Sequence, residues 1–289
     1  MTTTTSIADT IQNAFNFSVD KYRLSGPDNM KTDHFGLFRS DNLECVGNAV
    51  RKGYEPHTTD DIIALAEAAA SAFDSEATIH CNWRDGHYVS VAPSKEHRRA
   101  IYGEKDNIFP RLIIRAGYDG QAFNACLGFY RDACRNLAML RSITSTCAKI
   151  RHTHSLRGNM DDLKNTFAHL AASWDGTVQS IQRMEETKVD IKDFLLSIYP
   201  VNSEASESAQ TRAQNRMEKL ITRLLREKEV TGRPRSNQSS VWELYNCIQG
   251  YVQHDKSRKG RIGEFDRAIL AFNDQDVKKA EELALSLAI

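Results

Sequence analysis

Cysteine and histidine side chains that could do chemistry occur in two short stretches of the sequence. Cys134 lies in Tyr130-Arg-Asp-Ala-Cys-Arg-Asn136, where flanking arginines would lower the pKa of a thiol and favour a nucleophile. The alternative is a small buried cysteine, which is the more common outcome. An enzyme built on this stretch would need a histidine from elsewhere in the fold, because none is adjacent in the sequence.

Arg151-His-Thr-His154 is the second stretch with chemical potential. If it is a strand, His152 and His154 share one face, and Cys147 or His80 could complete a metal site. A polar sheet face is the alternative. Since no carboxylate–histidine signature accompanies the pair, we expect no metal and no cofactor.

Known catalytic signatures are absent from the sequence. It has no GxxxxGK[ST], GxGxxG, HExxH or GxSxG motif and no paired-carboxylate nuclease motif, so nucleotide hydrolysis is not indicated. None of the six cysteines forms a CxxC pair, and scattered cysteines fit a reducing cytosol. The sequence therefore favours a role other than catalysis, with an enzyme around Cys134, His152 and His154 as the remaining possibility.

Basic side chains gather in two clusters, although the chain of 289 residues has a net charge of zero. Guanidinium groups suit phosphate, and basic residues beside aromatic rings suit single strands. One cluster lies on the predicted sheet and after it, and the other follows an aromatic helix that begins at Ser240. The predicted nucleic-acid-binding residues are Arg84, His87, Arg115, Arg131, Arg135, Lys149, Arg151, Lys256, Arg258, Lys259 and Arg261. The alternative for all of them is a solvated or salt-bridged surface.

The helices and strands predicted along the chain, which must position these residues, indicate an α+β fold. It is an antiparallel β-meander with short helices, followed by a mostly helical C-terminal half. We divide the chain into an N-terminal arm (1–29), a β-rich lobe (30–155) and a helical lobe (156–289). Thr58 to Asp61 resembles a capping box that opens a helix. Phe129 to Leu140 is interpreted as a short helix, and Thr144 to His154 as a strand. Val178 to Ile198 is interpreted as continuous helix.

Two Asp-Gly pairs, Asp85-Gly86 and Asp119-Gly120, predict tight hairpins. The first would place Trp83 opposite Tyr88 and put Arg84 and His87 on a polar face. In the second, Ile114, Ala116, Tyr118 and Phe123 would be buried, with Arg115 facing the other way. A slip of one residue would reverse these faces.

Several motifs carry a family resemblance. They are Tyr22-Arg-Leu-Ser-Gly26, Phe35-Gly-Leu-Phe-Arg39, Gly117-Tyr-Asp-Gly120, Tyr130 to Asn136, Ile150-Arg-His-Thr153 and Trp242 to His254. Together they resemble the phage/plasmid-like "domain of unknown function 932" family over residues 20–289. The resemblance implies a mobile-element origin and supplies no catalytic residues. The order of hairpins and helices is loosely similar to single-strand annealing proteins, which is an analogy of topology alone.

These observations lead to two principal hypotheses. The first is a phage or plasmid DNA-binding protein that binds single-stranded DNA, as a single-strand annealing or recombination accessory factor. The second is an anti-defence or host-takeover protein that binds a host protein. We expect a location in the cytoplasm of a bacterial host, since the sequence shows neither a signal peptide nor a membrane span. Whether the chain forms a homo-oligomer stays open.

Overall fold

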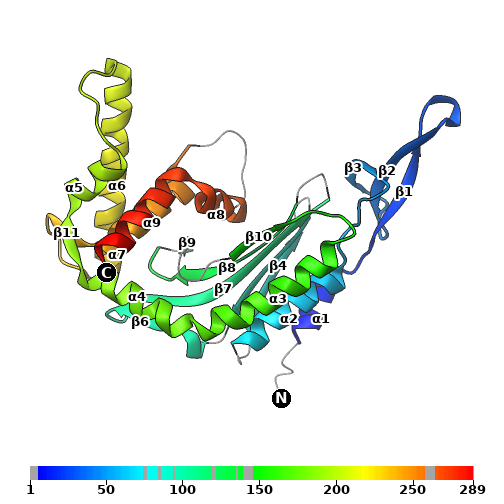
Figure 1. Cartoon of the computed structure of the whole chain (residues 1–289), viewed down its shortest axis with the longest axis horizontal. Helices are drawn as coiled ribbons and strands as arrows, with labels where there is room; N and C mark the ends of the chain where they lie inside the picture. Colours follow the sequence, from blue (N-terminus) through cyan, green and yellow to red (C-terminus); the bar gives the residue numbers. More distant parts are fainter. Residues whose placement is uncertain are drawn as a thin grey trace. The chain divides into compact units, whose positions relative to one another are not determined.

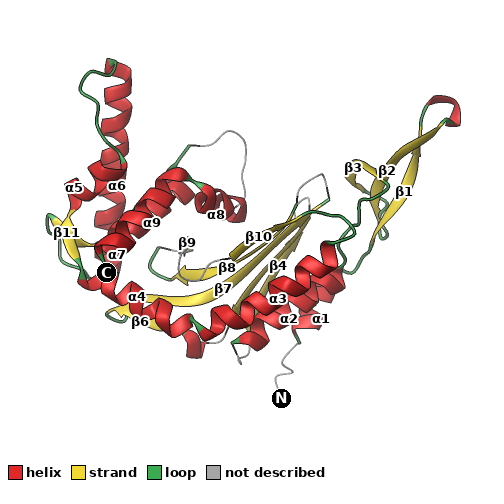
Figure 2. Cartoon of the chain, in the orientation of Figure 1, coloured by secondary structure: helices red, strands yellow, loops and turns green. Residues whose placement is uncertain are grey.

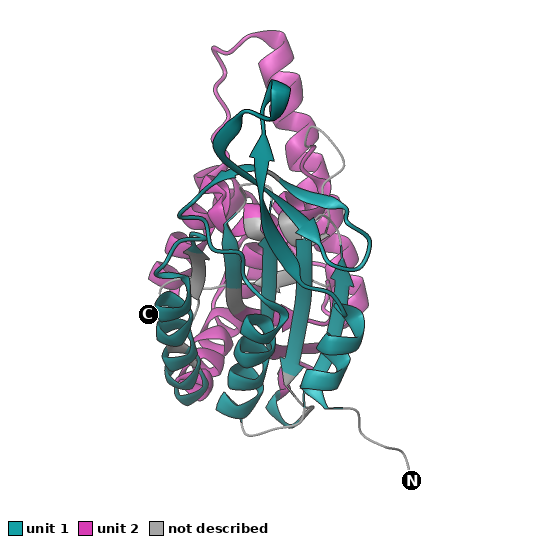
Figure 3. Ribbon diagram, turned by 90° about the vertical axis from the view of Figure 1, so that its right-hand side faces the viewer, with its two compact units in different colours: residues 1–97, 110–127, 145–172 teal, residues 98–109, 128–144, 173–289 magenta. Residues whose placement is uncertain are grey.

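A computed structural model of the chain describes residues 6–73, 77–83, 86–93, 95–118, 122–134, 136–138, 146–257 and 264–288. The chain forms two compact units (Figure 3), and each is assembled from separate segments. Unit 1 comprises residues 1–97, 110–127 and 145–172, and unit 2 comprises residues 98–109, 128–144 and 173–289. The predicted α+β fold is confirmed: an antiparallel meander precedes a mostly helical part (Figure 2).

Unit 1 contains the meander and three helices (Figure 1). The helices are α1 (Ile7–Ala14), α2 (Thr59–Ala72) and α3 (Leu156–Ala172), and the strands of the larger sheet are β4 (Ala77–Trp83), β5 (Gly86–Pro93), β7 (Asp106–Gly117), β8 (Phe123–Arg131) and β10 (Thr146–Ile150). The order across the sheet is β10-β8-β7-β5-β4. The three helices lie along one face of it, with α1 against β4, α2 against β5 and α3 against β10. Thus α3, which begins after the predicted boundary at residue 155, belongs to the same unit as β10.

The core of unit 1 follows from two simple patterns. Thr58 and Asp61 form the predicted capping box, which satisfies backbone donors at the start of α2. The apolar face of α2 is buried, and the cross-strand pairs Val89–Ile114 and Val91–Leu112 fill the sheet beneath. Alternation along the strands therefore produces one apolar face against the helices.

The first Asp-Gly pair connects β4 and β5 as predicted, but the predicted register is wrong by one residue. Trp83 pairs with His87, and Asn82 rather than Trp83 pairs with Tyr88. The last pair of the hairpin, Trp83 and His87, is therefore separated by three residues, instead of the two of the predicted turn. Gly86 has φ +148° and already belongs to β5; a Cβ there would lie 2.4 Å from the carbonyl oxygen of Ala116. Because the side-chain period is two, the shift moves His87 to the apolar face.

The N-terminal arm contributes a helix and the first strand of a small sheet. Residues from Ile7 onward form α1, and β1 (Val19–Ser25), β2 (Lys31–Arg39) and β3 (Cys45–Arg51) make a separate sheet in that order. The β1–β2 hairpin turns at Asp28 and Asn29, which both have positive φ, a conformation that Asp and Asn tolerate better than most residues.

The second hairpin is confirmed by neighbouring strands β7 and β8, and the predicted strand after it is β10; residues 119–121 lie outside the described residues. Ile114, Ala116, Tyr118 and Phe123 are buried as expected. The predicted helix from Phe129 to Leu140 is wrong. That segment continues β8 to Arg131, turns, and forms β9 (Asn136–Ala138). Arg131 is fully buried, like Phe129 two residues earlier. A charged residue at a buried position breaks the apolar–polar alternation by which a strand is recognised in the sequence.

Unit 2 consists mainly of helices. They are α4 (Trp174–Glu186), α5 (Ile191–Ile198), α6 (Glu207–Thr231), α7 (Val241–Gly250), α8 (Glu264–Asn273) and α9 (Gln275–Leu287), with β6 (Arg99–Tyr102), β9 and the short pair β11 (Lys188–Asp190) and β12 (Gln238–Ser240). The predicted continuous helix from Val178 to Ile198 is therefore interrupted by β11. Gly232 ends α6 in the left-handed conformation, with φ 75°.

Helix α7 forms the centre of unit 2. The helix begins after Ser240 as predicted, Ser240 and Glu243 form a capping box, and every residue of α7 is buried. A π-helical turn, Tyr251–Asp255, continues the helix. Within the described residues, no helix is both long and apolar enough to cross a membrane.

Candidate functional site

The predicted nucleic-acid-binding residues separate into buried, exposed and undescribed groups. His87, Arg115 and Arg131 are buried. The prediction that His87 and Arg115 lie on a polar, accessible face of the sheet is therefore wrong. Arg151 is exposed and Lys256 half-buried. Outside the described residues lie Arg84, Arg135, Arg258, Lys259, Arg261 and the side chain of Lys149. Of the described members, only Arg151 presents an exposed guanidinium group.

Arg131 is held by a buried ion-pair network in unit 2. Its Nε and Nη2 donate to the two carboxylate oxygens of Asp106 at 2.6 and 2.9 Å, and Nη1 donates to Glu227 at 3.0 Å. Burial raises the pKa of Asp106, but Arg131 and Arg233 outweigh it and hold that pKa below its usual value. For Glu227, burial outweighs its two arginine partners, and the pKa is raised. An arginine paired in this way positions the strands and helices around it.

The same network continues through Arg233. Its Nη2 lies 2.7 Å from Asp106 and donates to Glu185 at 2.9 Å. The Ser240 hydroxyl also donates to Glu185, at 2.6 Å, which connects the start of α7 to α4. The buried charges and the Ser240 hydroxyl therefore join three helices, α4, α6 and the start of α7, to two strand ends of unit 2. Such pairs are costly to break singly, because one charge is then left without a partner.

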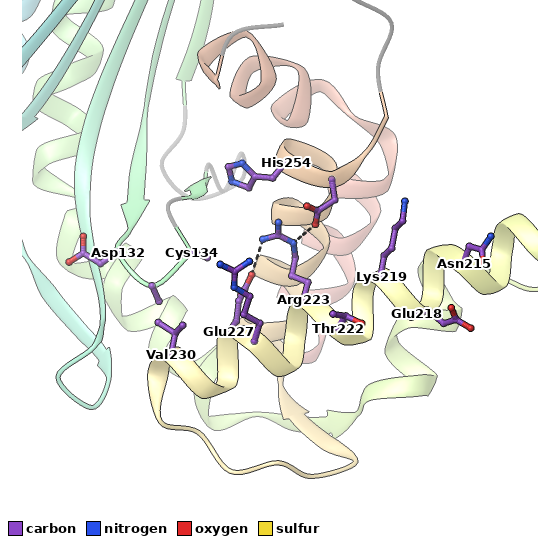
Figure 4. A pocket seen from close by; sticks show the side chains of 13 residues that line it. Asp132, Cys134, Asn215, Glu218, Lys219, Thr222, Arg223, Glu227, Val230 and His254 are labelled. Atoms are coloured by element: carbon purple, nitrogen blue, oxygen red, sulfur yellow. Dashed lines mark hydrogen bonds and ion pairs between the residues drawn. The ribbon is translucent and has the colours of Figure 1, made fainter. Parts of the chain in front are cut away.

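An open cleft of about 1220 Å³ lies in unit 2 between the turn after β8, α6 and the π-helical turn (Figure 4). Arg223 bridges two of its carboxylates, donating to Asp255 at 2.6 Å and to Glu227 at 3.3 Å. The charged lining consists of Lys219, Arg223, Arg226, Asp132, Glu218, Glu227 and Asp255, with His254. Since carboxylates outnumber arginines and lysines, this lining does not favour a polyanion.

Cys134 reaches this cleft, half-buried, with its Sγ 3.7 Å from Arg131 Nη1. The arginine neighbour expected from the sequence is therefore present. The histidines of the enzyme hypothesis, His152 and His154, belong to unit 1, whereas Cys134 belongs to unit 2. Neither unit by itself contains all three.

Three buried histidines form a hydrogen-bonded row in unit 1, which we name the histidine row. His57 Nδ1 lies 2.9 Å from His152 Nε2, and His57 Nε2 lies 2.9 Å from His87 Nδ1. The pKa of His57 lies well below its usual value, mainly because the side chain is buried and secondly because of the neighbouring imidazoles. Burial, then Arg39 and Arg115, lower the pKa of His87 to about 3. His57 and His87 are therefore neutral at physiological pH.

The histidine row is not arranged as a metal chelate. His57 uses its two ring nitrogens in opposite directions, so the three imidazoles do not share a centre. Among the described residues, no group of three or more histidine, cysteine, aspartate or glutamate side chains could hold a metal ion. The predicted pairing of His152 with His154 is also wrong, because β10 ends at Ile150 and His152 is buried while His154 is exposed.

Exposed cations gather in unit 1 around the base of the β1–β2 hairpin. Lys21 Nζ donates to the carbonyl oxygens of Lys52 and Tyr54 at 2.7 and 2.9 Å, which holds β1 against the turn after β3. The Glu55 amide donates to the carbonyl oxygen of His152 at 3.2 Å, so this turn runs beside the segment after β10. We define the basic surface as Lys21, Arg23, Arg51, Lys52 and Arg151.

Lys21 and Arg23 share one face of the hairpin sheet with Phe35, whereas Arg51, which pairs with His34, lies on the other face. Lys21 Nζ and Arg23 lie 5.2 and 5.6 Å from the ring centre of Phe35, within range of cation–π attraction. Arg51, Lys52 and Arg151 are exposed, and no carboxylate pairs with them in the described part of the chain. Glu55 is the exposed carboxylate on the turn itself. Of the basic surface, the sequence analysis predicted only Arg151. The basic residues clustered in Lys21-Tyr-Arg23 and Arg51-Lys52 were the signal that could have indicated the others.

The fold is thus an α+β meander, and the described residues around the base of its hairpin include several exposed cations. The model of the family described as "Domain of unknown function (DUF932)" matches residues 47–284. The chain belongs to this family. The match includes the resembling motifs from Gly117 onward, whereas Tyr22–Gly26 and Phe35–Arg39 precede it. Neither the curated proteins nor the solved structures gave a match to the chain.

Proposed function

We propose that the chain is a single-stranded DNA-binding protein of phages or plasmids, acting in the cytoplasm of the bacterial host as an annealing or recombination accessory factor. The observation that carries the proposal is the basic surface, where Lys21 and Arg23 lie over the ring of Phe35, and where exposed Arg51, Lys52 and Arg151 have no carboxylate partner among the described residues. Phosphates bind cations, and bases stack on aromatic rings, so this combination suits a single strand. The mobile-element origin follows from the family resemblance alone.

Salt-dependent binding tests the proposal. Fluorescence anisotropy would measure the affinity for a labelled single strand between about 50 and 200 mM salt. We expect the triple variant Arg51→Ala/Lys52→Ala/Arg151→Ala to bind more weakly and to lose up to about 0.7 in salt slope for each lost contact. The matched control is Lys219→Ala/Arg226→Ala/Lys279→Ala, which removes three exposed charges from unit 2.

Two results would contradict the proposal. If the wild type binds no single strand at about 50 mM salt, where electrostatic binding is strong, the chain does not bind DNA in this way. If both triple variants lose affinity equally, the effect comes from net charge and not from the basic surface.

A protein partner is the second candidate, favoured by exposed apolar side chains on the hairpin sheet. Tyr22, Met30 and Leu43 are each more than half exposed, and such side chains are enriched at interfaces when they cluster. A photo-crosslinking amino acid in place of Met30 checks this candidate. Adducts with one host protein, absent when the probe replaces the exposed Lys192, would support it.

A further inference from the structure

A second cavity in unit 1 lies at the base of the hairpin, beside the basic surface. Its volume is about 520 Å³, which is within the range of small-molecule sites. The buried side chains of Phe15, His57 and Tyr118 line it together with half-buried Phe17. Exposed Gln12, Asn16 and Asp60 also line it. We name it the hairpin pocket.

The aromatic lining is rigidly supported. Tyr118 stacks on His57 with ring centres 4.3 Å apart and planes 8° apart, and its hydroxyl donates to the carbonyl oxygen of His57 at 2.9 Å. Phe15 contacts His87 edge-on at 4.5 Å. These contacts leave the rings little freedom, so a flat ligand would enter a preformed aromatic site. Preformed sites lose less entropy on binding.

The polar lining selects against phosphate. Asp20 and Asp60 contribute carboxylates, and the lining contains no arginine or lysine. Arg39 lies over the ring of Phe17, 3.8 Å from its centre, and is paired with Asp41. A phosphate group would meet uncompensated negative charge in this cavity, whereas a neutral ring with amino groups would find acceptors.

The side chains of Gln12, Asn16 and Asp60 make no hydrogen bonds within the described part of the chain, and so are available to a ligand. Amides of this kind pair with adenine, and carboxylates accept hydrogen bonds from the amino group of cytosine. Thymine offers no amino group. The available groups therefore match the edge of an amino-bearing base.

We propose that the hairpin pocket binds one nucleobase that carries an exocyclic amino group, which adenine, cytosine and guanine have and thymine lacks, with its sugar and phosphate outside. The inference rests on the proposed function, because it places one base of the bound strand here and the phosphates on the basic surface. The chain itself connects the two sites. Asp20 in the pocket and Lys21 in the basic surface are consecutive in β1, so their side chains leave opposite faces of one strand.

Nucleosides test the pocket without phosphate. Saturation-transfer NMR with about 10 mM deoxyadenosine, deoxycytidine or thymidine should give binding of the first two and at least about five-fold weaker binding of thymidine. Asp60→Ala removes a hydrogen-bond acceptor and should weaken this preference, and Phe17→Leu should weaken binding of every nucleoside. Asp33→Asn, an exposed carboxylate of β2 outside the pocket, is the control and should behave as wild type.

The outcomes separate this proposal from the previous one. The basic-surface triple variant should bind deoxycytidine as the wild type does, because nucleosides lack phosphate. DNA binding without any nucleoside signal, or equal signals in wild type and Asp60→Ala, would overturn the pocket and leave the basic surface standing. Nucleoside binding without DNA binding would support base recognition and overturn the function proposed for the whole strand.

Discussion

The histidine row makes the stability of unit 1 depend on pH in a calculable way. The pKa of His87 is about 3 in the folded chain, and that of His57 is also well below its usual value. An imidazole in the unfolded chain has a pKa of about 6.5. Below that pH the unfolded chain binds protons that the folded chain does not. Acidification therefore favours unfolding, and the stability is fully present only above about pH 6.5.

The size of the effect follows from the linkage relation. Between about pH 7.5 and 5.5, one such histidine destabilises the fold by about 1.4 kcal/mol, and His57 and His87 together by about 2.7 kcal/mol. Urea unfolding at the two pH values measures it, and fluorescence of Trp83, whose ring lies 5.1 Å from that of His87, reports on unit 1.

Matched variants isolate the contribution of the histidine row. His87→Gln retains a polar side chain that does not titrate, so it should lose about half of the pH dependence. His154→Gln changes an exposed histidine outside the row and should behave as wild type. Equal stability at both pH values, or an undiminished pH dependence in His87→Gln, would refute the reasoning.

Three further expectations concern unit 2. Arg131→Met should destabilise the chain by about 3–5 kcal/mol in urea unfolding, because Asp106 loses its bidentate partner in the interior, whereas Arg98→Ala removes a surface pair and should cost about 1 kcal/mol or less. Gly232→Ala should lower the stability by about 1–2 kcal/mol through its positive φ, while Gly176→Ala, in open space within α4, should raise it slightly; the reverse order would contradict the backbone argument. Ser240→Ala removes a buried helix cap and should cost about 1–2 kcal/mol, read from the melting temperature.

Short sequence signals predicted much of the fold, because the helix caps and helix ends that they specify depend only on neighbouring residues. The capping boxes at Thr58 and Ser240 and the helix stop at Gly232 each depend on residues within one turn, and all are present. The failures came from long-range effects. Arg131 looked like a surface residue until Asp106 and Glu227, both distant in sequence, surrounded it.

The candidate sites were less predictable than the fold for the same reason. The register of the first hairpin depended on whether two or three residues made the turn, and that single step carried His87 from a polar face into the histidine row. The hairpin pocket joins residues of α1, β1 and α2 to Tyr118. No spacing within the sequence indicates that these residues meet.

The division of each unit into separate segments has a consequence for synthesis on the ribosome. Unit 1 is completed by α3, which ends at Ala172, whereas the early segments of unit 2, residues 98–109 and 128–144, must wait for helices that are made last. Asp106 and Arg131 are synthesised long before Glu227 and Arg233. A nascent chain paused after Ala172 would therefore contain Asp106 and Arg131 without Glu227 and Arg233, their partners in the buried charge network. Such an incompletely folded intermediate is a substrate for chaperones.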